Sequence, residues 1–341
     1  QEVPKALTSL KYFHENAPQY AIVAAGSLLG VALHQGTSFP VGKVDFLDLY
    51  PLNFREFLCA MGEKQFVSML DSCDTQMVTV FKTKYIERLR EYYFVGGMPE
   101  VVKDFSEKKD YNRVRAIQKN LINYYQQDFS KHAEIKLVPR LNLVWNSIPM
   151  QLAKENKKYI YGQVREGSRA KDFELAIQWL LDCGLIHKVQ RIQKPDLPLK
   201  AYIDFDAFKL FLVDIGLLIA MTDLDAKVII EGNKIFTEFK GSLTEQYILQ
   251  QLISDVGVIP YYYSTQNSKG EIDFLVQGKT SVIPIEVKAE ENLKAKSLKA
   301  FCEKYQPSYA VRTSMSDYRE QDWMTNIPLY AIKWIENYVN Q

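Results

Sequence analysis

The stretches Glu271-Ile-Asp-Phe-Leu-Val276 and Ile283-Pro-Ile-Glu-Val-Lys288 alternate charged and apolar residues over two short runs. Successive side chains of a strand point to opposite faces, so the alternation predicts two strands, with Asp273 on the polar face of the first and Glu286 and Lys288 on that of the second. Residues 277–280, Gln-Gly-Lys-Thr, have the composition of a hairpin loop. We therefore predict an antiparallel hairpin at the centre of the carboxy-terminal part of the chain.

The register of this hairpin decides whether its carboxylates converge. Pairing Val276 with Ser281 sets Asp273 opposite Pro284 and diagonal to Glu286 on the same face. Diagonal neighbours lie roughly 7 to 8 Å apart, a gap that two carboxylates can close around one divalent cation. Mg²⁺ prefers oxygen ligands and lowers the pKa of a bound water. We predict that Asp273 and Glu286 are ligands of Mg²⁺ or Mn²⁺.

Two further side chains extend the predicted site. Residues 241–252 carry apolar residues at helical spacing, which predicts an amphipathic helix with Glu245 in its first turns. Glu245 is then a third acid, and Lys288 is placed to hold the attacking water or the phosphorus. Alternating charge is also ordinary on the exposed face of an antiparallel sheet, so a solvated face is the alternative interpretation.

In this order, Glu245, Glu-Ile-Asp273 and Ile-Glu286-Val-Lys288 resemble the PD-(D/E)xK nuclease-like superfamily. The proline that usually precedes the aspartate is Ile272 here. The resemblance implies a nuclease-like α/β domain in which these four acidic and basic side chains are the catalytic residues. Related domains often keep the fold after losing catalysis, so an inactive scaffold remains the alternative.

The amino-terminal part carries a second set of characteristic strings. We expect a helix over residues 3–16 and then a buried strand over 20–25 that ends in Gly26-Ser-Leu-Leu-Gly30. Together with Tyr50-Pro-Leu-Asn-Phe-Arg-Glu-Phe57 and Gly96-Gly-Met-Pro99, this string resembles a large group of bacterial predicted ATPases of the AAA+ superfamily. These proteins carry a carboxy-terminal domain of unknown function, and the resemblance covers nearly the whole chain.

The AAA+ resemblance has consequences for nucleotide binding. It implies that Gln1-Glu-Val-Pro4 directly follows the acidic Walker B strand, and no Gly-x-x-x-x-Gly-Lys-Ser/Thr string occurs in the sequence. We therefore expect ATP binding only together with an amino-terminal part that carries these motifs. Ser27 matches the polar sensor position and is the predicted cofactor-binding residue, whereas a helix cap is its structural alternative.

The middle of the chain reads as helices followed by two strands. The expected helices span residues 111–129, 137–154 and 169–182, the last capped by Ser168 and stopped by Gly184, and the strands span 185–189 and 201–205. This order is typical of a winged helix, in which Arg165, Arg169 and Lys171 would contact DNA or RNA phosphates. Packing against neighbouring domains is the equal alternative.

Length and composition set the remaining expectations. The chain has 341 residues, a formal charge of +1, 47% hydrophobic and 24% charged residues, an ordinary globular composition. The apolar stretch 21–33 is too short to span a bilayer, and the four cysteines show no close pairing, as expected for a cytoplasmic protein without membrane partners. We predict an α/β multidomain protein with boundaries at 1–105, 106–228 and 229–341, and a possible homo-oligomer.

Two functions of different classes follow from these patterns. The first is a Mg²⁺-dependent nuclease module acting on DNA or RNA under nucleotide control. The second is a nucleotide-switched regulatory protein in which the nuclease-like fold is only a scaffold. Their discriminating feature is the state of the carboxylates, because a scaffold should show them bonded to the chain's own lysines.

Overall fold

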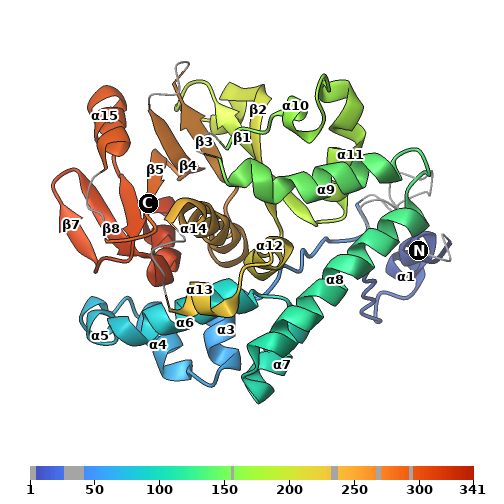
Figure 1. Cartoon of the computed structure of the whole chain (residues 1–341), viewed down its shortest axis with the longest axis horizontal. Helices are drawn as coiled ribbons and strands as arrows, with labels where there is room; N and C mark the ends of the chain where they lie inside the picture. Colours follow the sequence, from blue (N-terminus) through green and yellow to red (C-terminus); the bar gives the residue numbers. More distant parts are fainter. Residues whose placement is uncertain (1–4, 27–41, 155–156, 232–236, 266–269, 292–294) are drawn as a thin grey trace.

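One eight-stranded mixed sheet forms the centre of the computed structural model, which describes residues 5–26, 42–154, 157–231, 237–265, 270–291 and 295–341. The strand order is β2-β1-β3-β4-β5-β6-β8-β7 (Figure 1). The strands are β1 (Ile186–Ile192), β2 (Ile203–Leu212), β3 (Tyr261–Ser264), β4 (Glu271–Gln277), β5 (Val282–Val287), β6 (Val311–Ser314), β7 (Arg319–Gln321) and β8 (Met324–Pro328).

Helices surround this sheet and form a separate layer beneath it in Figure 1. The α-helices are α1 (Lys5–Asn16), α3 (Phe54–Ala60), α4 (Lys64–Asp71), α5 (Thr75–Val80), α6 (Lys82–Val95), α7 (Pro99–Lys108), α8 (Tyr111–His132), α9 (Val138–Leu152), α10 (Tyr161–Val164), α11 (Ala170–Asp182), α12 (Ile215–Met221), α13 (Ala226–Ile230), α14 (Thr237–Gln251), α15 (Lys296–Tyr305) and α16 (Glu336–Val339). A π-helix, η3 (Leu252–Val256), continues α14, and 3-10 helices are η1 (Leu199–Tyr202) and η4 (Leu329–Ile335).

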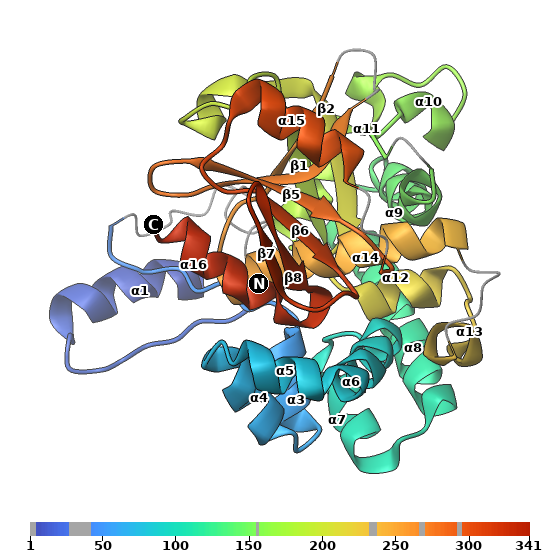
Figure 2. The ribbon, with the colours of Figure 1, turned by 90° about the vertical axis from the view of Figure 1, so that its left-hand side faces the viewer.

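The two faces of the sheet are covered by different helices. The larger apolar core joins Tyr247 of α14 to Phe274 and Ile285 of the sheet, and the smaller joins Phe301 of α15 to Ile272. Figures 1 and 2 show α14 and α15 on opposite sides of the strands. The predicted placement of Ile272 and Phe274 on one face is therefore wrong, because β4 changes face between them.

A β-bulge causes this change of face. Along the β3–β4 ladder Tyr261 pairs with Leu275 but Tyr263 pairs with Ile272, so β4 holds one extra residue around Asp273. Bulges of this kind re-aim a side chain and are frequent beside functional sites. No residue of the β4 sequence indicates the bulge, so the alternation of residue types could not predict it.

The predicted β4–β5 hairpin is present, but its register differs by two residues. Val276 pairs with Ile283 instead of Ser281, and the ladder ends at the pair Phe274–Ile285. A shift of two leaves the side chains of the paired residues, 274–277 and 282–285, on their expected faces. In the observed register, Asp273 lies just beyond the end of the ladder, beside Glu286. The predicted register placed it opposite Pro284.

Residues 242–251 of helix α14 are all buried, in contrast to the amphipathic helix that we predicted over 241–252. Its glutamines enter the core because their amides bond to backbone groups of other elements. Gln246 accepts from the N–H of Leu212 and donates to its carbonyl oxygen, at 3.0 and 2.7 Å, and Gln250 accepts from Ile215 N–H at 3.1 Å. Buried amides satisfied in this way cost little, so polar periodicity does not mark the exposed face.

The chain preceding α3 partly departs from the expected ATPase core. The predicted amino-terminal helix is confirmed as α1, whereas residues 20–26 form no strand and their side chains are exposed, 90% in the case of Val23. Among the described strands none pairs with this segment, and an apolar run needs such a neighbour to become a buried strand. The prediction of a buried strand over 20–25 is therefore wrong for this structure.

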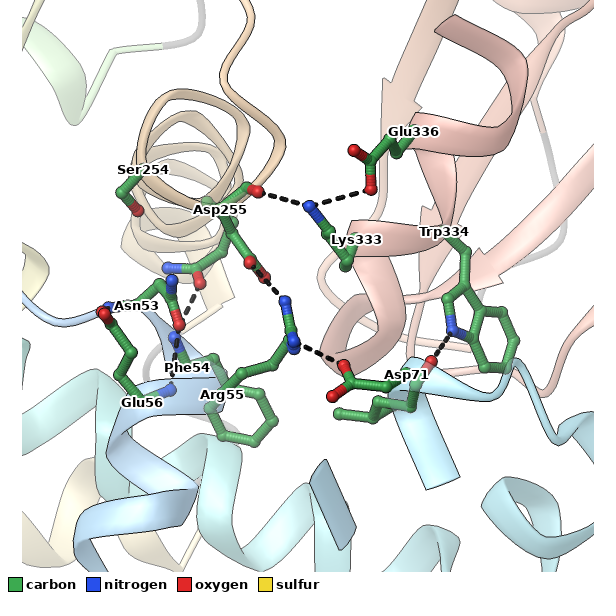
Figure 3. Close-up of polar contacts among 12 residues, drawn as sticks. Asn53, Phe54, Arg55, Glu56, Asp71, Ser254, Asp255, Lys333, Trp334 and Glu336 are labelled. Carbon is green, nitrogen blue, oxygen red and sulfur yellow. Dashed lines mark hydrogen bonds and ion pairs between the residues drawn. The ribbon is translucent and has the colours of Figure 1, made fainter. Parts of the chain in front are cut away.

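Residues 53–71 dock onto the end of α14. Asn53 and Glu56 form a capping box at the start of α3, as the spacing Asn-x-x-Glu predicts. The adjacent Arg55 bridges two carboxylates, at 2.5 Å to Asp71 and 2.8 Å to Asp255 of the π-helix (Figure 3). Because Asp255 has a side chain only 5% exposed, this arginine supplies a buried counter-charge and holds the two segments together.

The pair Gly96-Gly97 before Pro99 predicts a tight turn between helices, and it lies between α6 and α7, where it also contacts a buried carboxylate. Asp214 is fully buried, accepts from the N–H of Gly97 at 2.6 Å, and caps α12 by accepting from Leu217 N–H at 3.0 Å. Burial raises the pKa of Asp214, while these N–H donors oppose the shift. The glycine pair therefore permits close approach of two segments far apart in sequence.

The helices of the middle region are confirmed, with one change of cap and one change of context. Arg169, not Ser168, is the N-cap of α11, where Asp172 accepts from its N–H, and Gly184 ends the helix at a left-handed φ of 67° as predicted. The hairpin that we expected to be a wing is the β1–β2 pair, and β1 also pairs with β3. It is therefore an edge of the common sheet.

His187 on β1 makes folding stability pH-dependent. Burial lowers its pKa to about 4, below the usual 6.5. Between these values the unfolded chain binds the extra proton, so this contribution to stability is complete above pH 6.5 and is lost as the pH falls toward 4. We expect a loss of about 1–2 kcal/mol between pH 7 and pH 5, measured by urea unfolding.

His187→Gln should remove this part of the pH dependence, whereas His132→Gln at the end of α8 should leave it unchanged. An equal fall in stability between pH 7 and pH 5 in wild type and His187→Gln would contradict the assignment.

None of the helices in the described part of the chain is both long and apolar enough to cross a membrane.

Candidate functional site

Asp273 lies where strands β4 and β5 stop pairing. Its Oδ2 accepts a hydrogen bond from the backbone N–H of Val287 at 2.7 Å. Burial raises the pKa of Asp273 well above its usual range, and the negative charges of Glu245 and Glu286 raise it further. Three of the four predicted catalytic side chains are therefore electrostatic neighbours.

Glu286 and Lys288 form an ion pair beside Asp273. Glu286 is 4% exposed, and the Nζ of Lys288 lies 2.6 Å from its Oε1. Burial raises the pKa of Glu286, partly opposed by Lys288; burial lowers the pKa of Lys288, but Glu286 reverses this and leaves it raised. Lys288 is therefore an ammonium group suited to hold an anion, not a proton acceptor.

Glu245 is held on the buried helix α14 by two lysines that the sequence did not suggest. Lys157 forms an ion pair with its Oε1, and Lys209 lies 3.7 Å from its Oε2. Burial alone would raise the pKa of Glu245, but Lys157 and Lys209 reverse this effect and leave the pKa lowered. Glu245 is accordingly ionised, and its charge is shared between two cations.

Lys209 is the most deeply buried charge of the cluster. Its side chain is 0% exposed and lies 2.5 Å from Oε1 of Glu271, with its Nζ 4.8 Å from the centre of the Tyr262 ring. A lysine within the apolar run Ala-Phe-Lys-Leu-Phe-Leu of β2 is the signal by which sequence inspection could have found it. Lys157 has no comparable local signal.

The cluster contains four carboxylates and three ammonium groups. They come from residues distant in sequence, and the acids outnumber the bases by one. Burial is the main cause of the raised pKa of Asp273, and the excess of negative charge from Glu245 and Glu286 raises it further. The members are Glu245, Glu271, Asp273, Glu286, Lys157, Lys209 and Lys288.

The donor set suits a hard divalent cation at Asp273 and Glu286. Oε2 of both Glu245 and Glu286 is buried and has no hydrogen-bond partner among the described residues. Within the same residues, no three His, Cys, Asp or Glu side chains are arranged so as to hold a metal ion. This leaves the two-carboxylate mode in which Mg²⁺ keeps several waters and binds substrate phosphate.

The predicted nucleic-acid contacts lie on exposed parts of the middle region. Arg165, Arg169 and Lys171 are exposed at the end of α10 and the start of α11. The chain leading to α10 is joined to β2, because Tyr159 N–H donates to Phe208 O at 2.8 Å, next to Lys209. These residues border the segment that carries Lys157, while Ser27 lies outside the described residues.

Three family models match the chain. One described as an AAA domain matches residues 1–58, a domain of unknown function (DUF8612) matches 86–228, and a second such domain (DUF4143) matches 240–332. No curated protein and no solved structure matches it. The AAA resemblance is thereby confirmed for the amino-terminal segment, whereas the nuclease-like resemblance and the domain boundaries stay predictions.

Proposed function

We propose that this chain cleaves phosphodiester bonds of DNA or RNA in a Mg²⁺- or Mn²⁺-dependent manner, at a site formed by Asp273, Glu286, Lys288 and Glu245. The observation that supports this most is the raised pKa of Asp273 between two other acids, beside buried carboxylate oxygens that accept no hydrogen bond from the described residues. Strongly perturbed acids clustered at the end of paired strands are typical of catalytic sites.

Each side chain has a distinct task in this proposal. Asp273 and Glu286 bind the cation, with Glu245 contributing negative charge from α14. When bound, the cation supplies an activated water and neutralises charge on the phosphate. The Lys288 ammonium holds a phosphate oxygen in place, and Arg165, Arg169 and Lys171 bind the nucleic-acid backbone.

The amino-terminal segment supports a role for nucleotide in the proposed activity. It is similar to an AAA domain over residues 1–58. We propose that nucleotide binding by a complete ATPase part controls the carboxylate site, in a cytoplasmic protein that assembles as a homo-oligomer. ATP is a cofactor only in that complete form.

A regulatory scaffold is the second candidate, and a specific observation favours it. Glu245, Glu271 and Glu286 are each bonded to a lysine of the same chain. Such pairs neutralise a buried site without a cation. In this case the nuclease-like part would transmit the nucleotide state to a bound partner and cleave nothing.

One assay separates the two candidates. The purified chain is incubated with labelled single- and double-stranded DNA and RNA, with Mg²⁺, Mn²⁺ or EDTA, beside Lys288→Ala and the exposed control Lys299→Ala on α15. We expect metal-dependent cleavage that Lys288→Ala lowers by about 10² or more and the control retains. Absence of cleavage together with absence of metal binding would support the scaffold.

A further inference from the structure

Two lysines that precede α14 in the sequence contact the carboxylate cluster. The carboxylates of this cluster come from α14 and from the strands that follow it. Lys209 comes from the middle of β2 and Lys157 from the connection between α9 and α10. Both contact Glu245, one at each carboxylate oxygen. The charge of this acid is therefore set from outside the part of the chain that carries the Glu-x-Lys strand.

The two lysines differ in how firmly they are held. Lys209 is 0% exposed, lies on a paired strand and has a second acid, Glu271, at 2.5 Å. The Lys157 side chain is 12% exposed, and the ion pair recorded for it is with Glu245. Lys209 can leave only if the sheet opens, whereas Lys157 lies outside the sheet and is partly exposed.

A divalent cation and Lys157 would compete for the same negative charge. The cation binds best when Glu245 contributes its full charge beside Asp273 and Glu286, and a bound ammonium group removes part of that attraction. The same ammonium also repels the cation directly. Lys157 therefore occupies a position from which its charge controls metal affinity.

We infer that Lys157 is a positioning residue that sets the metal affinity of the carboxylate site by competing for Glu245, while Lys209 is its permanent counter-charge. This inference rests on the proposed function, because it assumes that a divalent cation binds beside Asp273. It assigns to the middle region a control over that site.

The test is a titration of the intact chain with Mn²⁺. Binding is measured by calorimetry and by the paramagnetic resonance signal of the free ion. Lys157→Met removes the charge but keeps the length of the side chain. We expect Lys157→Met to bind Mn²⁺ more tightly than wild type, with a dissociation constant lower by a factor of about ten or more. Lys157→Arg, which keeps the charge, and the exposed control Lys136→Met should bind as wild type.

Thermal unfolding without metal provides the second measurement. Lys157→Met should keep the midpoint within about 3 °C of wild type, since its acid retains Lys209. Lys209→Met should lower the midpoint by about 5–10 °C, because it removes the cation nearest to Glu271 and the second cation beside the buried Glu245. Equal losses in both variants would overturn the distinction between a removable and a permanent lysine.

The outcomes for this inference and for the proposed function are separable. Unchanged or weaker Mn²⁺ binding by Lys157→Met overturns the inference, even where wild type cleaves nucleic acid. Tighter binding without cleavage by any variant supports the inference and overturns the proposed activity. No Mn²⁺ binding by wild type or by either Lys157 variant overturns both.

Discussion

Asp273→Asn is expected to abolish metal-dependent cleavage while leaving the fold at least as stable as wild type. The variant loses a metal ligand, which removes several kcal/mol of charge stabilisation in the transition state and lowers the rate by a factor of about 10³ or more. Asparagine keeps the side-chain oxygen that accepts from Val287 N–H. Activity and stability should thus change in opposite directions.

The stability of this variant follows from the charges around the position. Burial and the neighbouring Glu245 and Glu286 raise the pKa of Asp273. A raised carboxyl pKa means that the folded chain binds the proton more tightly, so this contribution is present below the unfolded pKa and is lost as the pH rises through the folded value. In EDTA, wild type should therefore lose stability relative to Asp273→Asn on going from pH 5 to pH 8.

The measurements are initial cleavage rates and thermal unfolding with and without Mg²⁺. Ligand binding to the folded state raises the midpoint, so Mg²⁺ should stabilise wild type and leave Asp273→Asn unaffected. Asp322→Asn, at an exposed position near the carboxy-terminal end, is the matched control. Cleavage by Asp273→Asn at the wild-type rate would refute the proposed site.

Gly97→Ala is expected to produce the largest loss of stability from a single added carbon atom. A Cβ on Gly97 would lie 2.1 Å from the carbonyl oxygen of Leu52 and 2.9 Å from its nitrogen. These are backbone atoms, and the same Leu52 N–H donates to Gly97 O at 2.7 Å. The clash cannot be relieved without separating the two segments.

We expect this variant to lose about 3 kcal/mol or more, the sum of overpacking and a broken buried hydrogen bond. Separation of the segments also weakens the bond from Gly97 N–H to the buried Asp214. Gly162→Ala is the control, because its Cβ would meet nothing within 4 Å and alanine favours the helix α10. Urea unfolding of both variants gives the comparison.

The expected result would show that close packing against Leu52 fixes the shape of Gly96-Gly-Met-Pro99. A Gly97→Ala chain within about 0.5 kcal/mol of wild type would mean that the two segments separate easily. If Gly162→Ala keeps its stability and Gly97→Ala does not, the close backbone contact at Gly97 is the cause of the loss, and not the removal of a glycine as such.

The candidate site shows how far sequence reasoning extends. The types and faces of Asp273, Glu286 and Lys288 followed from the alternation of two short strands. Their actual neighbours depended on a register two residues away from the one expected and on a bulge in β4. Both depend on pairing with β3 and on the loop, whose preferences are too weak to be read from local sequence.

The sequence by itself determined the features that arise within a few residues. The capping box at Asn53 and Glu56 and the left-handed end of α11 at Gly184 both depend on local sterics and hydrogen bonds. Their energy depends on neighbours in the chain, so the pattern of residue types was sufficient.

Only the tertiary structure decided which charges meet. Lys157 and Lys209 contact Glu245 across 88 and 36 positions of sequence, and the polar helix α14 is buried because its glutamines bond to distant backbone. Burial strengthens every such interaction and makes an unpaired charge costly. The partners of a buried charge are therefore chosen by the whole fold, which local periodicity does not describe.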